Sequence, residues 1–150
     1  MENDTRILVK KIALKQDQEK AFAIRQKVFV EEQQVPAEEE YDEYEQISTH
    51  FLATDEAENP CGTARWRITE KGIKLERFAV LAPYRGKGVG TALVKKVLED
   101  IAEQTKQAPT LLYLHAQIQA MPLYQKFGFQ PIGDKFEECN IEHFKMIKQV

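Results

Sequence analysis

The chain has 150 residues, of which 43% are hydrophobic and 30% charged, and we expect one globular domain over residues 1–150. Its formal net charge of −3 argues against nucleic acid as a partner, because no basic stripe is present to replace the counterions of a phosphate backbone. Neither a signal segment nor an apolar run of membrane-spanning length occurs, which favours a cytoplasmic protein without a membrane partner. Cys61 and Cys139 lack C-x-x-C spacing, which favours reduced thiols.

Three elements are expected in the first third of the chain. Residues Thr5 to Leu14 predict a strand, and Gln18 to Glu31 predict a helix because apolar side chains recur there at helical spacing. Val35–Pro36 ends this helix, since proline cannot continue it. The stretch Glu38 to Glu45 follows as an acidic loop that carries two tyrosines.

Three strands are expected next. His50 to Thr54 and Gly62 to Ile68 predict a hairpin turned at Glu58–Asn59–Pro60. A second turn at Lys71–Gly72 leads into a strand over Leu75 to Val80.

A glycine-rich loop, Arg85 to Thr91, follows this strand and opens onto a helix. Three glycines occupy alternate positions and let the backbone approach an anion closely, while Arg85 and Lys87 add positive charge. The start of the next helix adds its positive dipole end. The sequence therefore predicts a diphosphate site in this loop.

Two nucleotide-binding motifs do not fit the loop. A Walker loop needs Ser or Thr directly after its lysine, whereas Gly88 follows Lys87. A dinucleotide fingerprint has Gly-x-Gly-x-x-Gly near the start of a βαβ unit, whereas the spacing here is Gly-x-Gly-x-Gly, late in the chain. A nucleotide-hydrolysing loop is therefore disfavoured.

The rest of the chain predicts an amphipathic helix, a buried strand, a short helix and a closing hairpin. Apolar residues from Leu93 to Ala102 recur on one helix face, and Thr110 to Ala116 is a nearly continuous apolar run, typical of a central strand. Met121 to Phe127 predicts a short helix, and Phe129 to Ile132 with Ile141 to Ile147 predict a hairpin. The expected fold class is α+β, a mixed and mainly antiparallel sheet with helices on both faces.

Two motifs resemble those of the GNAT N-acetyltransferases. The pattern Arg85-x-x-Gly88-x-Gly90 after Phe-Ala-Val is similar to the family's coenzyme A pyrophosphate loop. Further on, Gln117 stands where the family pattern Asn-x-x-Ala-x-x-hydrophobic-Tyr-x-x-x-Gly-Phe has its asparagine, and the positions that match this pattern are Ala120, Leu123, Tyr124, Gly128 and Phe129. A narrower likeness, over Arg25 to Pro36 and Phe136 to Met146, resembles the ElaA/YjcF-type branch of the family.

This resemblance implies the GNAT acyl-CoA N-acyltransferase fold and transfer of an acetyl group from acetyl-CoA to a primary amine, of a small molecule or a lysine, by direct attack in a ternary complex. A coenzyme A-binding regulatory or interaction module without turnover is the alternative. Homodimers are frequent in the family. No metal is expected, since His50 and His115 lack partners at metal-ligand spacing. The implied contacts to acetyl-CoA are Phe78, Ala79, Val80, Arg85, Gly86, Lys87, Gly88, Val89, Gly90, Thr91, Gln117 and Tyr124.

Acyl transfer needs an amine that loses a proton, a stabilised oxyanion and a protonated thiolate. By resemblance, the Val80 N–H would face the acetyl carbonyl, and Tyr124 would act as general acid at the sulfur unless it is only a core tyrosine. Glu76, four residues before Val80, is expected on the same strand face as a candidate base, or is a surface residue in an ion pair. His143 is a second candidate base, or a structural histidine.

The resemblance implies an acceptor pocket at the first helix and the loop after it. The candidate substrate residues are Arg25, Phe29, Glu32 and Arg65. The acidic stretch Glu38 to Glu45 would attract a cationic amine, or is a solvated loop. Arg25 and Arg65 would instead suit a substrate that bears a carboxylate.

Overall fold

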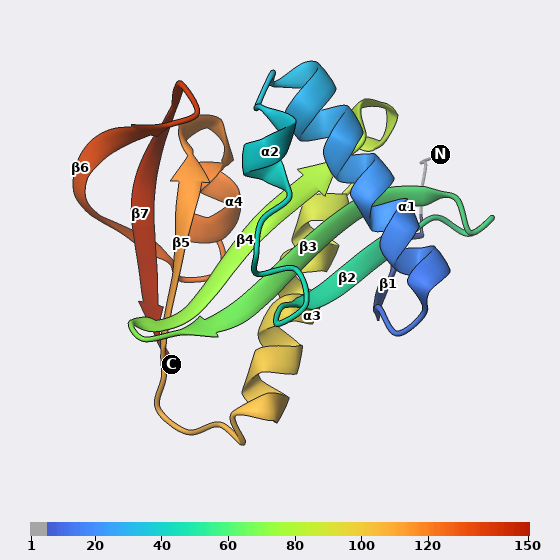
Figure 1. Ribbon diagram of the computed structural model, residues 1–150. Helices are drawn as coiled ribbons and strands as arrows, with labels where there is room; N and C mark the ends of the chain where they lie inside the picture. Colours follow the sequence, from blue (N-terminus) through green and yellow to red (C-terminus); the bar gives the residue numbers. More distant parts are fainter. Residues whose placement is uncertain (1–5) are drawn as a thin grey trace.

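Seven strands form one sheet in the order β1-β2-β3-β4-β5-β7-β6, in a computed structural model that describes residues 6–150 (Figure 1). All neighbouring strands are antiparallel except β4 and β5, which are parallel. This confirms the expected mixed, mainly antiparallel sheet. The strands are β1 (Leu8–Lys11), β2 (Thr49–Thr54), β3 (Pro60–Thr69), β4 (Gly72–Val80), β5 (Leu111–Gln117), β6 (Gln130–Glu138) and β7 (Ile141–Gln149).

Helices cover both faces of the sheet, as expected. One face carries α1 (Lys15–Arg25), a π-helical segment (Gln26–Glu32) and α2 (Ala37–Glu40). The opposite face carries the long helix α3 (Val89–Gln104) and the short α4 (Met121–Gln125) (Figure 1). Among residues 6–150, no helix has the length and apolar character needed to cross a membrane. Short 3₁₀ turns lie at Ala82–Tyr84 and Ile118–Ala120.

The central strands separate two cores because successive strand side chains point to opposite faces. On the α1 side, Leu52 and Ala79 pack with Ile24 and Val28. Each buried side chain of this kind contributes about 1.5–3 kcal/mol relative to exposure, alanine less. The larger core on the α3 side includes Phe51, Ala53, Trp66, Leu75, Leu93, Val97 and Leu112.

The outer strands differ in length from those predicted. β1 spans only four residues of the expected Thr5 to Leu14, and Thr5 lies outside the described residues. The closing hairpin is longer than expected, because β6 and β7 each run for nine residues to a tight turn at Cys139–Asn140. Both turn residues have positive φ angles, of 50° and 64°.

The first helix changes character at its end. It begins at Lys15, before the predicted start, and is α-helical only as far as Arg25. In the π-helical segment that follows, the backbone N–H of Gln33 bonds to the carbonyl of Val28, five residues back. Apolar spacing over so few residues does not distinguish this wider turn from an α-helix.

A β-bulge interrupts β4. Thr63 of β3 pairs with Ala79, whereas Arg65, two residues further along β3, pairs with Glu76, three residues back along β4. The extra β4 residue lies at Arg77, whose φ is 61°. Such an insertion shifts the alternation of side chains beyond it to the other face.

The bulge places Glu76 and Val80 on opposite faces of the sheet. Leu75 and Val80 both pack toward α3 although they are five residues apart, and Ala79 packs toward α1. Glu76 follows Leu75 and therefore points to the α1 side. The expectation that Glu76 shares a face with Val80 is wrong, because residue spacing does not reveal a bulge.

The parallel strands β4 and β5 are paired only near their starts. Their pairs are Ile73 with Leu112 and Lys74 with Tyr113. Beyond these residues the two strands diverge, as the V between them in Figure 1 shows. The backbone of each strand in this gap is thus not bonded to the other.

Candidate active site

The predicted diphosphate loop lies between β4 and α3. Gly86 and Gly88 have φ angles of 78° and 85°, a conformation that costs other residues about 1–2 kcal/mol. A Cβ atom added to either glycine would meet no atom within 4 Å, so both face open space. Gly88 caps the N-terminus of α3, whose first turn contains no acidic residue. The loop therefore offers backbone N–H groups, a helix dipole and the exposed Lys87 to an anion.

Arg85 is already held by a carboxylate. Its guanidinium donates two hydrogen bonds to Glu32, at 2.6 and 2.8 Å, and a third to the carbonyl of Val80 at 3.0 Å. The hydrogen bond from Arg85 lowers the pKa of Glu32. Glu32, which was predicted to bind the acceptor, thus contacts the loop predicted to bind the donor.

Gln33, the residue after Glu32, contacts Gln117, which was also predicted to bind acetyl-CoA. The side-chain amide of Gln117 donates a hydrogen bond of 2.9 Å to the side-chain oxygen of Gln33. Two consecutive residues at the end of the π-helical segment therefore hold Arg85 and Gln117, which are 32 positions apart in the sequence.

A cavity of about 190 Å³ lies where β4 and β5 diverge. It is closed at one rim by a contact between α2 and the β6–β7 turn, in which the Cys139 thiol lies 3.3 Å from a carboxylate oxygen of Glu39. Six residues that were predicted to take part in binding or catalysis line this cavity: Phe29, Glu76, Phe78, Gln117, Tyr124 and His143.

Tyr124 is buried at the α4 end of the cavity. Its ring meets the ring of Phe78 edge to face, with centroids 5.6 Å apart. Burial raises the pKa of the Tyr124 hydroxyl, so this group stays protonated at neutral pH and can act only as a proton donor there.

Glu76 lies in an ion-pair cluster. One of its oxygens is 2.7 Å from both Arg65 and Arg67, and the other is 3.4 Å from Lys74. Burial by itself would raise the pKa of Glu76, but Arg65 and the other two cations hold that pKa below its ordinary value. A carboxylate held in this way is a weak proton acceptor.

Arg65 does not face the cavity. Its side chain is fully buried and pairs with Asp42, Glu45 and Glu76 at 2.7–2.9 Å. Burial by itself raises the pKa of Asp42, yet hydrogen bonds from Arg65 and its charge lower that pKa to about 2. The expected role of Arg65 in substrate binding is therefore wrong, because the guanidinium is already neutralised within the fold.

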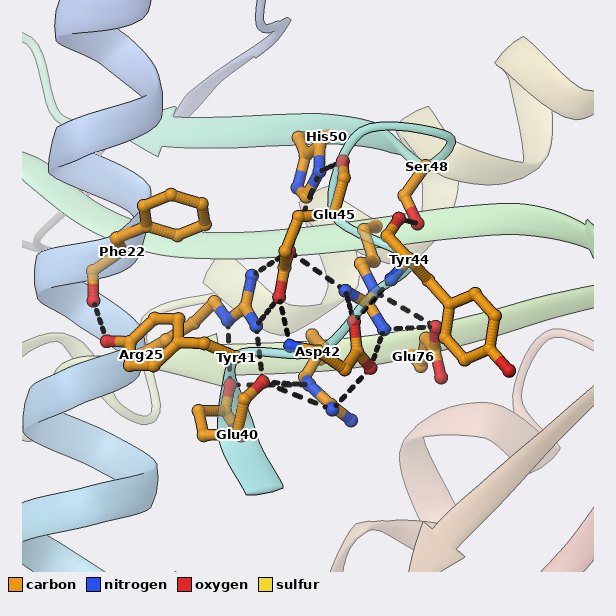
Figure 2. A network of polar contacts seen from close by, with 12 residues as sticks. Phe22, Arg25, Glu40, Tyr41, Asp42, Tyr44, Glu45, Ser48, His50 and Glu76 are labelled. Atoms are coloured by element: carbon orange, nitrogen blue, oxygen red, sulfur yellow. Dashed lines mark hydrogen bonds and ion pairs between the residues drawn. The ribbon is translucent and has the colours of Figure 1, made fainter. Parts of the chain in front are cut away.

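The same correction applies to Arg25. Its side chain is 1% exposed and pairs with Glu40 and Glu45, both at 2.7 Å (Figure 2). Glu40 is buried as well. The acidic stretch is thus no solvated loop, since three of its carboxylates tie it to the sheet and to α1 through buried arginines.

Two residues not predicted as site residues, His115 and Glu138, lie beside His143 in this cavity. Glu138 is 2.8 Å from Nδ1 of His115 and 3.9 Å from Nε2 of His143. Phe136 stacks on the His143 ring. The alternation of Phe136 and Glu138 along a hairpin strand, opposite a histidine, is the sequence signal that could have suggested this group.

Comparison with known proteins identifies the family. Residues 12–150 match the model of the acetyltransferase (GNAT) domain. The chain belongs to the GNAT acetyltransferases. It is 43% identical over 129 residues to the N-acetyltransferase YjcF of Bacillus subtilis, covering 85% of this chain and 89% of YjcF.

Solved GNAT structures share this fold. The crystal structure of ElaA from Escherichia coli superposes with a TM-score of 0.80 and 24% identity over 95% of this chain and 99% of ElaA. An aminoglycoside 6'-N-acetyltransferase complexed with coenzyme A gives a TM-score of 0.72 with 14% identity, over 95% and 96% of the two chains. The predicted GNAT fold and the likeness to YjcF and ElaA are confirmed.

Proposed function

We propose that this protein is an N-acetyltransferase that moves an acetyl group from acetyl-CoA to a primary amine, of a small molecule or a lysine, in a ternary complex. The observation that carries this proposal is the gap between β4 and β5: the cavity lined by Tyr124 lies there, and β4 leads from it to the glycine-rich loop. Membership of the GNAT family supports transfer of an acetyl group.

The donor site follows from the two ends of this gap. The loop from Arg85 to Thr91 holds the diphosphate through its backbone N–H groups, and includes Gly86, Lys87, Gly88, Val89 and Gly90. The pantetheine arm lies along Phe78, Ala79 and Val80, whose backbone does not pair with β5. Gln117 reaches the thioester end after it exchanges its bond with Gln33 for one to the ligand.

Each step of the acetyl transfer is assigned to a residue of β4 or of the cavity. The amine nitrogen attacks the acetyl carbonyl carbon, and the Val80 N–H donates to the oxyanion that forms. As the carbon–sulfur bond breaks, Tyr124 gives its proton to the leaving thiolate. A base takes the proton of the amine; His143 suits this role better than Glu76, whose oxygens are held by three cations.

We extend the proposal to the compartment, the domain organisation and the oligomeric state of the protein. Because Cys61 and Cys139 are free thiols, a reducing compartment such as the cytoplasm suits this chain. We further propose that residues 1–150 act as one domain and that two copies form a homodimer.

The test is release of coenzyme A thiol from acetyl-CoA in the presence of a panel of primary amines that includes putrescine, spermidine and a lysine peptide. We expect release with at least one amine, and a decrease of about 10²-fold or more in kcat for Tyr124→Phe, as for loss of a general acid. Coenzyme A binding without release on any amine, unchanged by Tyr124→Phe, would instead identify a binding module.

A further inference from the structure

Three strands of the C-terminal half bring two histidines and a carboxylate together. His143 of β7 lies opposite Gln117 of β5 and opposite Phe136 of β6. His115 and Glu138 are each two residues from these partners, and therefore lie on the same face. The three side chains line the cavity that also contains Tyr124.

A backbone contact selects the basic nitrogen of His143. Its Nδ1 lies 2.7 Å from the carbonyl oxygen of Ile141, and a carbonyl only accepts hydrogen bonds. Nδ1 therefore carries a hydrogen, so that in the neutral ring Nε2 has the free lone pair. Nε2 is the nitrogen 3.9 Å from Glu138.

Glu138 is an ionised partner for that nitrogen. Its other oxygen is bonded to Nδ1 of His115 at 2.8 Å, and this hydrogen bond lowers the pKa of Glu138. Exposure of the side chains rises from 8% at His143 to 25% at His115 and 45% at Glu138. A proton taken up at His143 therefore has a short path to solvent past Glu138 and His115.

Packing holds the two imidazole rings. The ring of Phe136 stacks on His143 with an interplanar angle of 22°, and meets His115 edge to face with centroids 5.1 Å apart. These contacts restrict both rings to the orientations that face Glu138.

Other charged groups around His143 are mostly neutralised. From α2, Glu40 is paired with Arg25; from β4, Glu76 is paired with Lys74 and two arginines, and Arg77 bonds to Glu40. The remaining titratable groups of the cavity wall are Glu39, His115, Tyr124, Cys139 and Glu138. Among the described residues, Glu138 makes its ion pairs with histidines only. It is therefore the carboxylate best placed to act on His143.

We propose, on the basis of the proposed acetyl transfer, that Nε2 of His143 takes the proton of the attacking amine and that Glu138, held by His115, is a positioning residue that stabilises the imidazolium so formed. The nitrogen–hydrogen bond of the amine breaks, its electron pair stays on nitrogen, and the proton passes from Nε2 to solvent after the acetyl group has left the sulfur. His143 lies opposite Gln117 and lines the same cavity, so the proposed base and the residue proposed for the thioester end are neighbours.

The test is the pH profile of kcat/KM with acetyl-CoA and whichever amine of the panel gives the fastest thiol release. In wild type, the acid limb of this profile reports protonation of the base. Glu138→Gln removes the charge that favours the imidazolium, so we expect the acid limb to move to lower pH and kcat to fall about tenfold. His143→Gln should lose the acid limb and lower kcat by about 10²–10⁴-fold.

Glu137→Gln is the matched control, because it makes the same charge change one residue away on the opposite strand face. We expect it to leave both kcat and the acid limb unchanged. Melting temperatures and coenzyme A dissociation constants of all variants should stay near those of wild type, which separates the catalytic effect from misfolding. His115→Gln should move the acid limb in the same direction as Glu138→Gln, by a smaller amount.

The tautomer provides a second measurement that needs no activity. The chain has three histidines, so ¹⁵N–¹H spectra of the imidazoles are readily assigned, and the neutral His143 ring should carry its hydrogen on Nδ1. A hydrogen on Nε2 would overturn the proposal. So would an active wild type together with a Glu138→Gln variant that keeps the rate and acid limb of wild type. If the wild type releases no thiol with any amine, the proposed function fails and this inference fails with it.

Discussion

At the scale of single residues, Glu32 holds the Arg85 guanidinium, which is part of the proposed diphosphate site. Both nitrogens of the Arg85 fork are bonded to the Glu32 carboxylate. A phosphate must therefore displace this carboxylate before it can form the same two-point contact. Both side chains are 44% exposed, so solvent weakens the pair, and the cost of breaking it is modest.

Glu32→Gln should consequently bind coenzyme A more tightly. The gain expected for an exposed ion pair is about 0.2–1 kcal/mol, which is up to about fivefold in the dissociation constant. Isothermal titration calorimetry with coenzyme A measures it. Glu31→Gln is the control, since it removes the same charge from a neighbouring exposed residue. Equal or weaker binding by Glu32→Gln would mean that Arg85 does not receive the diphosphate.

Arg65 differs from Glu32 because its partners are inside the fold. Arg65→Ala should destabilise the protein by about 3–5 kcal/mol, because Asp42 and Glu76 would be left without their buried cation. Urea denaturation gives this value. Arg6→Ala, which removes a 74% exposed arginine, should have almost no effect. A variant of Arg65 with normal stability and only a raised KM would restore its role in substrate binding.

At the scale of elements, the loop between β4 and α3 depends on left-handed glycines. Gly88 and Gly133 have φ angles of 85° and 79°, and a Cβ atom at either would meet no neighbour within 4 Å. Substitution by alanine therefore costs both positions the same backbone strain, about 1–2 kcal/mol. Only Gly88 belongs to the proposed diphosphate loop, whereas Gly133 lies in β6.

Because Gly88 and Gly133 have similar backbone strain, comparing the two alanine variants separates the effect of strain from the effect on coenzyme A binding. We expect Gly88→Ala and Gly133→Ala to lower the melting temperature by similar amounts. The dissociation constant for coenzyme A should rise about tenfold, or 1.4 kcal/mol, in Gly88→Ala alone, because the methyl group blocks close approach of the phosphate to the backbone. Unchanged affinity in Gly88→Ala would exclude this loop as the diphosphate site.

At the scale of the whole molecule, the two halves of the sheet meet along β4 and β5 and leave a gap between them (Figure 1). The N-terminal half contributes the π-helical segment and α2, and the C-terminal half contributes the histidines and Tyr124. A ligand that fills the gap must therefore touch segments from both halves at once.

Hydrogen exchange with bound coenzyme A tests this arrangement. Protection is expected in three segments that are separate in the sequence, namely residues 78–80, 85–91 and 117–124, while β1 and β2 should exchange as in the free protein. The physical reason is that amides lose access to water only where the ligand covers or orders the backbone. Protection of residues 85–91 alone would mean that the ligand is held by its diphosphate and does not enter the gap.

The elements and the glycine-rich loop could be predicted from the sequence because their signals are local. The apolar face of α3 and the glycines after β4 are contained in short stretches, and both were found in the predicted places. The π-helical segment was not predicted, since the spacing of apolar side chains over its seven residues is close to that of an α-helix.

The sequence by itself determined the fold class and the family and located the glycine-rich loop that we propose for the donor, because periodicity and motif spacing depend on residues near one another in the chain. Only the tertiary structure decided that Arg25 and Arg65 are buried in ion pairs, that a bulge at Arg77 turns Glu76 away from Val80, and that Glu138 lies between two histidines. These features depend on strand register and on which distant charges meet once water is excluded, and neither is encoded in a short stretch of sequence.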